Sequence, residues 1–225
     1  MSWMSTGIYY DRINRIVQQR AAPMASAPML IESLDFGSLY ALQSERDWRA
    51  AGKVLAESAK RLEGAGAEAL IIGANSMHRL HDEVAAAIQI PILHIADYVG
   101  RALNQAGYSK AALIGTRTVM AESFYRKRLV AEGIDVLPPD MANVEVLERI
   151  IYDELMVSKI SRDAQRSMKT IIINKAQQGA QAIVLACTEL NLIVDVDANV
   201  LPVFDATRIH CAAAADWILE QELVG

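Results

Sequence analysis

The sequence predicts an α/β protein made of two pseudo-symmetric, doubly wound lobes with parallel sheets. Short apolar runs alternate with longer amphipathic stretches, a pattern typical of buried strands covered by helices. The stretch GAEALIIGANSMH at 66–78 repeats the residue classes of GAQAIVLACTELN at 179–191. The same relation joins IPILH at 90–94 to LPVFD at 201–205, so we expect two similar lobes.

The expected elements follow one another in strand–helix order. Thr116 and Thr118 precede one expected helix and Ser161 precedes another, as residues that favour helix starts. The helices are expected at 5–20, 46–64, 79–88, 96–106, 120–132, 144–157, 162–178 and 206–222. The strands are expected at 28–34, 69–73, 91–95, 111–115, 134–138, 182–186 and 201–205.

The duplication also predicts how the chain divides into lobes. We expect lobe 1 at 1–97 and lobe 2 at 98–205, with a last helix in 206–225 packing back on lobe 1. No linker rich in Gly and Ser separates the halves, which favours lobes packed face to face. Ligands of open parallel sheets bind beyond the carboxyl ends of the strands. The sequence therefore predicts an active site in the cleft between the lobes.

The composition narrows the class of protein. The chain has 225 residues, of which 52% are hydrophobic and 22% charged, enough for a sizeable core. A net charge of -5 gives no basic surface for nucleic acid, and no apolar run is long enough for a membrane. Two cysteines make neither a disulfide framework nor a metal site, and no secretory signal is present. We expect a cytoplasmic enzyme or small-molecule binder without a metal.

The two copies of the repeat differ where chemistry is expected. Ala74 aligns with Cys187, Asn75 with Thr188, and Ser76 with Glu189. Inverting a carbon centre by proton transfer needs one group on each face of the carbon. A thiol, with an ordinary pKa of about 8.5, suits this role when a helix N-terminus lowers its pKa. We expect a short helix at 189–193 to do so for Cys187.

Other residues have simpler interpretations. Cys211 lies among alanines and is expected to pack in a helix. His78 and His94 are expected to make structural hydrogen bonds, and His210 is assigned to the last helix. Arg46, Asp47 and Arg49 are expected to form a solvated helix start. No phosphate-binding glycine motif is present.

Several short motifs resemble those of the cofactor-independent aspartate/glutamate racemases. The landmarks are MSWMST at 1–6, SLDF at 33–36, ANSMH at 74–78, HIAD at 94–97, IGT at 114–116, SKI at 158–160 and ACTEL at 186–190. The resemblance covers essentially the whole chain. It implies a homodimer, without pyridoxal phosphate or another cofactor, that interconverts the enantiomers of an acidic amino acid. It also implies that Cys187 serves one face of the α-carbon, and that the substrate is held by Ser2, Asn75, Ser76, Thr116, Lys159 and Thr188.

Three departures from the family pattern carry consequences. The second catalytic residue of the family, a Cys or Thr, falls at Ala74, so racemisation is expected to be impaired. Family members usually place a strand and a Gly-Gly turn ahead of the MSW segment, so we expect a first strand to be absent from this sequence. SLDF stands where some aspartate racemases have an arginine that reaches the side-chain carboxylate, which leaves the exact substrate open.

Two alternatives stay open beside the racemase interpretation. One is a decarboxylase of the same superfamily, in which a single thiol, here Cys187, protonates an enediolate on one face. The other is a catalytically inactive protein that binds an amino acid. The sequence does not distinguish a natural Ala74 from an engineered one.

Overall fold

The computed structural model describes residues 1–44, 47–196 and 198–222. The chain forms two compact units. Unit 1 comprises Met1–His94 and the chain from His210 onward, and unit 2 comprises Ile95–Ile209. We describe each unit by itself.

Unit 2 contains a four-stranded sheet in the order β2-β1-β3-β4, in which every neighbouring pair is parallel. The central pair is in register from Ala111 opposite Ala182 to Gly115 opposite Ala186. The predicted α/β class with a parallel sheet is therefore confirmed. The strands are β1 (Lys110–Gly115), β2 (Asp135–Val136), β3 (Ala182–Ala186) and β4 (Val203–Asp205).

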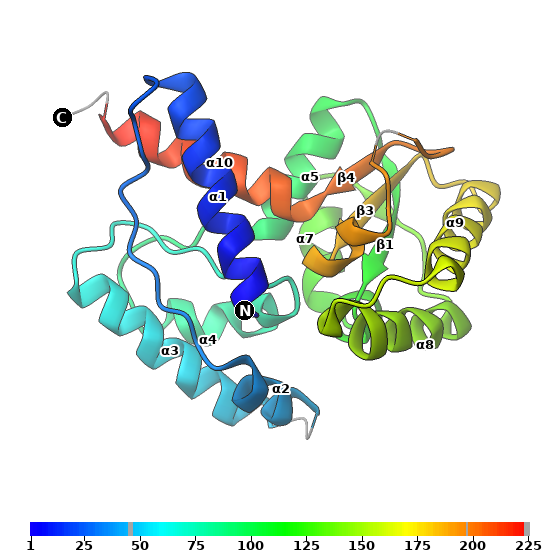
Figure 1. Cartoon of the computed structure of the whole chain (residues 1–225), viewed down its shortest axis with the longest axis horizontal. Coiled ribbons are helices and arrows are strands. Elements are labelled where there is room, and N and C mark those ends of the chain that lie inside the picture. The colour runs from blue at the N-terminus through cyan, green and yellow to red at the C-terminus, as the bar shows by residue number, and fades with distance from the viewer. Residues whose placement is uncertain (45–46, 197, 223–225) are drawn as a thin grey trace. The chain divides into compact units, whose positions relative to one another are not determined.

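Helices cover both faces of this sheet (Figure 1). Along β1, Ala112 and Ile114 face one core while Ala111 and Leu113 face the other, as the period of two in a strand requires. The first core includes side chains of α8 (Met141–Arg149) and α9 (Arg162–Gln177), and the second those of α5 (Ile95–Gln105) and α7 (Ser123–Ala131). Burial on both faces explains why these strands are unbroken apolar runs.

Several helices of unit 2 differ from expectation in detail. The stretch expected as one helix at 120–132 is divided between α6 (Arg117–Ala121) and α7. The helix expected at 144–157 changes from α8 to a π-helical turn (Ile150–Glu154) and a 3-10 turn (Leu155–Val157). It ends at Ser158, whose φ of 60° lies in the left-handed region. Ser161 caps α9 as predicted, since its Oγ accepts a bond from Ala164 N at 3.0 Å.

Unit 1 is mostly helical. Asp47 caps α3 by accepting from Ala50 N at 3.0 Å, and Arg46 lies outside the described residues. The helix α2 was not predicted. The elements are α1 (Trp3–Arg20), α2 (Phe36–Ser44), α3 (Trp48–Gly64), a 3-10 turn η1 (Ser76–Leu80), α4 (His81–Ala85) and the part of α10 (Ala206–Glu222) from His210 onward.

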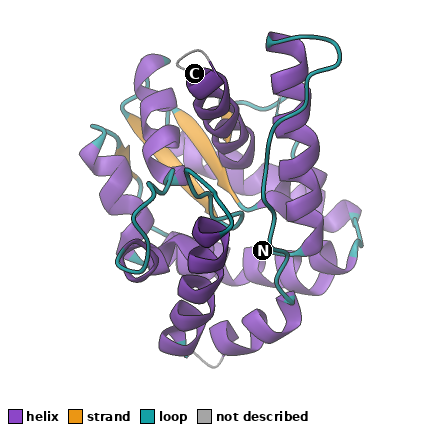
Figure 2. Cartoon of the chain, turned by 90° about the vertical axis from the view of Figure 1, so that its left-hand side faces the viewer, coloured by secondary structure: helices purple, strands orange, loops and turns teal. Residues whose placement is uncertain are grey.

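Three expected strands of unit 1 are not strands in the structure. Residues 28–34 have no regular structure, and the connection from α1 to α2 is a loop (Figure 2). Residues 69–73 and 91–95 meet only in an isolated parallel bridge between Leu70 and Ile92. The expectation was wrong here because a strand needs a neighbour along its length, and apolar sequence alone does not supply one.

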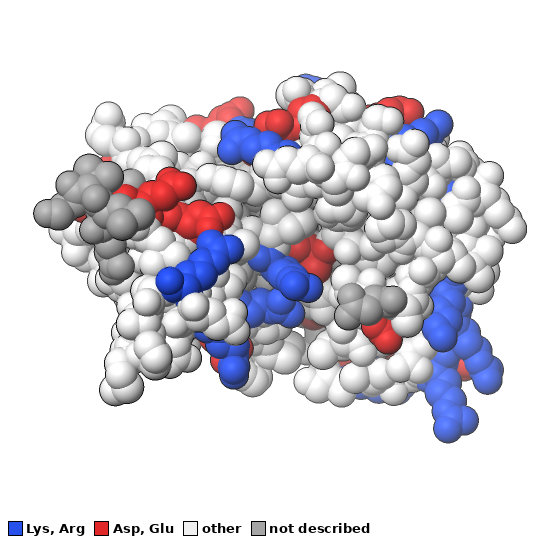
Figure 3. Space-filling view, turned by 90° about the horizontal axis from the view of Figure 1, so that it is seen from above, with Lys and Arg blue, Asp and Glu red and all other residues white. Residues whose placement is uncertain are grey.

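In the described residues, no helix is long and apolar enough to cross a membrane. On the face shown in Figure 3, basic and acidic side chains are intermixed among uncharged ones.

Candidate active site

The candidate site in unit 2 centres on Cys187, the residue that follows β3. Cys187 is the N-cap of a short 3-10 helix, η4 (Thr188–Leu192), close to the helix expected at 189–193. Its side chain is buried, and Sγ donates to Glu189 Oε2 at 3.1 Å. Thr188 Oγ1 donates to the same oxygen at 2.7 Å. One oxygen of the Glu189 carboxylate thus accepts hydrogen bonds from both the thiol of Cys187 and the hydroxyl of Thr188.

The protonation of this thiol differs from what the sequence predicts. Burial raises the pKa of Cys187 well above its ordinary value, and the nearby carboxylate of Glu189 raises it further. The backbone N–H groups of Glu189 and Leu190 at the start of η4 lower the pKa but do not outweigh these effects. The expected lowering was therefore wrong, since desolvation and an adjacent negative charge both disfavour a thiolate.

Thr116 lies at the same edge of the sheet as Cys187. The last paired residues of β1 and β3 are Gly115 and Ala186, so Thr116 and Cys187 leave adjacent strands at the same level. Thr116 is buried, and its Oγ1 has no hydrogen-bond partner within the described part of the chain. Gly115 permits this approach, because a Cβ there would lie 2.7 Å from Ala186 O. A buried hydroxyl without a partner is costly and calls for an explanation such as a ligand.

The corresponding loop of unit 1 holds Ala74, Asn75 and Ser76. His78 Nδ1 donates to Ala74 O at 2.9 Å, and Ala74 N donates to Ile72 O at 2.8 Å, which fixes the turn. Asn75 is buried, and no partner for its Oδ1 is found among the described residues. Ser76 begins η1. His78 thus positions this loop, a role in keeping with the structural hydrogen bond expected of it.

Ser2 and Met1 reach the same loop from the start of the chain. The ammonium of Met1 donates to Gly73 O at 2.7 Å. Ser2 is buried and caps α1, since its Oγ accepts from Ser5 N at 3.1 Å. This bond uses one acceptor position of the Ser2 hydroxyl.

Lys159 belongs to unit 2. It is exposed in the turn after Ser158, and its backbone N–H donates to Glu154 O at 2.9 Å. Among the described residues, no contact joins its ammonium to Cys187, Thr188 or Thr116. A substrate role for Lys159 therefore rests on the family resemblance alone.

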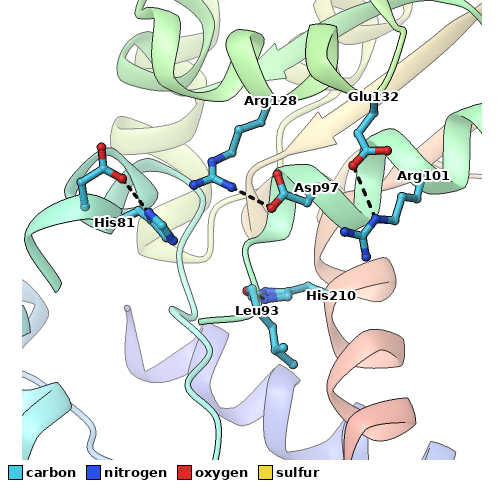
Figure 4. A network of polar contacts seen from close by, with 8 residues as sticks. His81, Leu93, Asp97, Arg101, Arg128, Glu132 and His210 are labelled. Carbon is cyan, nitrogen blue, oxygen red and sulfur yellow. Dashed lines mark hydrogen bonds and ion pairs between the residues drawn. The ribbon is translucent and has the colours of Figure 1, made fainter. Parts of the chain in front are cut away.

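All four histidines of the chain gather in unit 1. The ring centroid of His94 lies 4.5 Å from that of His78 and 5.1 Å from that of His81, and the centroids of His78 and His210 are 5.6 Å apart. His210 Nε2 donates to Leu93 O at 2.7 Å (Figure 4). Its Nδ1 lies 2.8 Å from the hydroxyl of Tyr9. Burial lowers the pKa of His210 to about 4, so the ring is neutral at pH 7.

The remaining predicted features have plain roles. Cys211 is fully buried against α1 side chains such as Ile13 and Val17, as expected of a packing residue. In unit 2, Asp97 forms an ion pair with Arg128 (Figure 4), with Oδ2 and Nη1 2.7 Å apart. Across residues 1–44, 47–196 and 198–222, no group of three or more His, Cys, Asp or Glu side chains is placed to hold a metal.

Fold and site together define an α/β protein with a thiol-centred polar cluster at the carboxyl edge of a parallel sheet. The model of the Asp/Glu/hydantoin racemase family matches residues 1–214, and the chain belongs to this family. A broad-specificity amino-acid racemase, RacX of Bacillus subtilis, is 24% identical over 155 residues. That match covers 69% of this chain and 66% of RacX, just under two thirds of its length.

Two solved structures extend the comparison over nearly the whole chain. A crystal structure from Yersinia pestis, described as a candidate Asp/Glu racemase, is 40% identical with a TM-score of 0.90. It covers 97% of this chain and 95% of its own. An aspartate racemase homologue from Pyrococcus horikoshii is 29% identical with a TM-score of 0.82, covering 96% and 94% of the two chains. The family is named for racemases, which are isomerases.

Proposed function

We propose that this protein exchanges the α-proton of an acidic amino acid by thiol chemistry, without pyridoxal phosphate or another cofactor. The observation that carries the proposal is the buried Cys187–Thr188–Glu189 cluster at the edge of the β1–β3 pair, beside the unpartnered hydroxyl of Thr116. Family membership supplies the reaction class. The substrate class is drawn from the names of the relatives, and aspartate and glutamate are the candidates.

The proton path starts from the thiol of Cys187. Because its Sγ–H already donates to Glu189 Oε2, this carboxylate is placed to take the proton and leave a thiolate. The thiolate then removes the α-proton from one face of the substrate, and the electron pair is delocalised into the α-carboxylate. The Sγ proton then exchanges with solvent through Glu189, and return of a solvent-derived proton from Sγ to the same face completes an exchange without inversion.

The polar residues around the two loops are proposed to hold the substrate. Thr116 Oγ1 and Asn75 Oδ1 are buried and have no partner in the described chain. A hydroxyl can donate to a carboxylate, and an amide oxygen can accept from an ammonium. Ser2, Ser76, Thr188 and Lys159 complete the proposed set.

Ala74 restricts the proposed proton exchange to one face of the α-carbon. Its methyl group neither accepts nor donates a proton, so the face served by the second family residue has no base. We therefore expect exchange of the α-proton to be much faster than inversion. A Cys or Thr at position 74 would supply the missing group.

The experiment is α-proton exchange in D₂O, followed by NMR, with L- and D-aspartate and L- and D-glutamate in parallel. We expect deuterium to enter one enantiomer with its configuration retained, and Cys187→Ser to abolish this. Cys211→Ser is the matched control, since it removes the other buried thiol and should leave exchange unchanged. Ala74→Cys should add inversion, measured by chiral chromatography. No exchange in the parent chain and no inversion in Ala74→Cys or Ala74→Thr would refute the proposal.

A second function is favoured by the same alanine and by the protonated thiol. Loss of carbon dioxide from a substituted malonate leaves an enediolate, which needs one proton on one face and no second base. Cys187 Sγ–H would supply that proton, and solvent would restore it through Glu189. Release of carbon dioxide with formation of a single enantiomer would support this decarboxylase, and absence of release would exclude it.

The third candidate is a binding protein without turnover. Calorimetric binding of aspartate or glutamate with no deuterium incorporation at the α-carbon would support it. We further propose that the protein works in the cytoplasm and that it forms a homodimer. Sedimentation equilibrium tests the homodimer directly.

A further inference from the structure

Two buried side-chain oxygens of unit 2 have no role in the proposed function. They are Glu154 Oε2 and Asn191 Oδ1, and neither has a hydrogen-bond partner in the part of the chain that the structure describes. A carboxylate oxygen that is removed from water without a donor is costly, and so is an amide oxygen. Both atoms are hydrogen-bond acceptors, so the group that satisfies them must be a donor.

Asn191 lies on the same short helix as the candidate site. This helix, η4, begins directly after Cys187. Side chains three residues apart eclipse one another in a 3-10 helix, so Asn191 shares an edge of η4 with Thr188. Leu190, between them in the chain, is fully buried in the core. The unpartnered amide oxygen is therefore carried by the edge of η4 that holds one of the proposed substrate-binding residues.

Glu154 is brought to η4 by the irregular end of the preceding helix. It is the last residue of the π-helical turn that follows α8, and the 3-10 turn after it contacts η4. Leu155 and Leu190 lie in one core cluster together with Cys187. Because Glu154 and Asn191 are the chain neighbours of these two leucines, both unpartnered oxygens lie beside the same part of the core as the thiol. Single π-helical turns occur frequently at functional sites.

The backbone around Glu154 has an unusual conformation that its own hydrogen bonds hold. Glu154 has a φ of -121° and a ψ of -66°, away from helical values, and Ser158 has a φ of 60°. Ser158 N donates to Leu155 O at 3.0 Å, and Lys159 N donates to Glu154 O at 2.9 Å. A residue other than glycine in the left-handed region is uncommon, and such conformations cluster at ligand-binding sites.

An ammonium group fits the two oxygens. The carboxylate supplies a negative charge and the amide a neutral acceptor, whereas an ammonium has three N–H donors to share between them. Among the residues that the structure describes, Glu154 belongs to no group of three side chains that could hold a metal. We propose that Glu154 and Asn191 bind the ammonium group of the amino-acid substrate. This inference rests on the proposed function and assigns the amino group to a pair of residues in unit 2.

This contact has a chemical consequence at the α-carbon. A carboxylate beside an ammonium favours its protonated form. The positive charge withdraws electrons from the adjacent α-carbon, so the α-proton is easier for the Cys187 thiolate to remove. Glu154 takes no proton in this scheme: it binds the amino group and keeps it charged while the α-proton leaves.

The test compares ligands with and without an amino group. Calorimetry measures the binding of both enantiomers of aspartate and glutamate, and of succinate, to the parent chain and its variants. Glu154→Gln removes the charge at constant shape, and Asn191→Ala removes the amide. A double variant combines Glu154→Gln with Asn191→Asp and so moves the carboxylate from one side chain to the other. Asp153→Asn is the matched control, since it removes a neighbouring carboxylate whose side chain is exposed.

We expect Glu154→Gln to weaken the binding of the preferred amino acid at least about tenfold, and Asn191→Ala to weaken it less. Succinate binding should stay level or become stronger in Glu154→Gln, because succinate is an anion without an ammonium. The double variant should regain most of the lost affinity, whereas Asp153→Asn should match the parent. Urea unfolding of each variant reports on the fold, and Asn191→Ala with the double variant decides the matter if Glu154→Gln alone does not fold.

The proposal is overturned if Glu154→Gln binds the amino acid as the parent does. It is also overturned if amino acid and succinate are weakened equally, or if the double variant regains no affinity, since Glu154 would then act on the fold alone. Deuterium exchange in the parent together with unchanged binding in Glu154→Gln would refute this contact and leave the proposed function standing. A parent chain that binds neither aspartate nor glutamate would refute both.

Discussion

We expect the folded state of unit 1 to lose stability at acid pH because of His210. Its ring is fully buried, Nε2 donates to Leu93 O at 2.7 Å, and Nδ1 lies 2.8 Å from the Tyr9 hydroxyl. Because the carbonyl can only accept, Nε2 carries the proton and Nδ1 accepts from Tyr9. Both ring nitrogens are thus satisfied in the neutral form. A second proton would charge a ring that burial has removed from water, next to the ring of His78.

The magnitude follows from the pKa difference between the folded and unfolded chain. The folded pKa of His210 is about 4, against an ordinary value of 6.5. Below pH 6.5 the unfolded chain binds a proton that the folded chain does not, so folding becomes less favourable as the pH falls. At about 1.4 kcal/mol per pH unit, the loss between pH 6.5 and pH 4 approaches about 3 kcal/mol. Above pH 6.5 this contribution is fully present.

Two measurements check this prediction. NMR titration of the four histidine rings should show one ring that stays neutral down to about pH 4, and Tyr9→Phe should identify it by perturbing its signal. Urea unfolding of His210→Gln between pH 7 and pH 4 should show a shallower decline in stability than the parent chain, by about one proton. A His210 ring that titrates near pH 6.5, or equal pH dependence in the two proteins, would refute the reasoning.

Three further predictions concern unit 2. Tyr125→Phe removes a fully buried hydroxyl that has no partner in the described residues, so the free energy of unfolding should stay level or rise by up to about 1 kcal/mol. A lower free energy of unfolding in urea would show that the hydroxyl is hydrogen-bonded. Gly115→Ala places a Cβ 2.7 Å from Ala186 O and should cost about 1–3 kcal/mol, with an unchanged urea midpoint as the contrary result. Ser161→Ala removes the cap of α9 and should cost about 1 kcal/mol, whereas Ser161→Asp should keep most of it.

The strands show where sequence patterns suffice and where they do not. Residues 182–186 were predicted as a strand, and β3 has these bounds because its apolar run is buried on both faces. Residues 28–34 carry a similar pattern, yet they form a loop because no neighbouring strand pairs with them. Periodicity reports which residues avoid water, whereas pairing depends on a partner elsewhere in the chain.

The candidate site shows the same division. Aligning the two repeats singled out Cys187 and Asn75 without any coordinates, and the family resemblance added Thr116. The environments of these residues do not follow from the sequence. Burial and the carboxylate of Glu189 raise the pKa of Cys187, whereas the sequence predicts that the helix start lowers it. The missed role of Glu189 had a signal in the sequence, since an acidic residue two positions after a buried thiol can fold back onto it.

The sequence by itself determined the α/β class, the internal repeat, the family resemblance and the alanine at position 74, because each of these depends only on residue type and spacing. Tertiary structure decided that Cys187 is buried, with its pKa raised, and that Thr116 Oγ1 and Asn75 Oδ1 have no partner in the described part of the chain. It also decided that residues 69–73 and 91–95 meet in an isolated bridge between Leu70 and Ile92. Solvation and hydrogen bonding depend on groups distant in the sequence, and only folding brings those groups together.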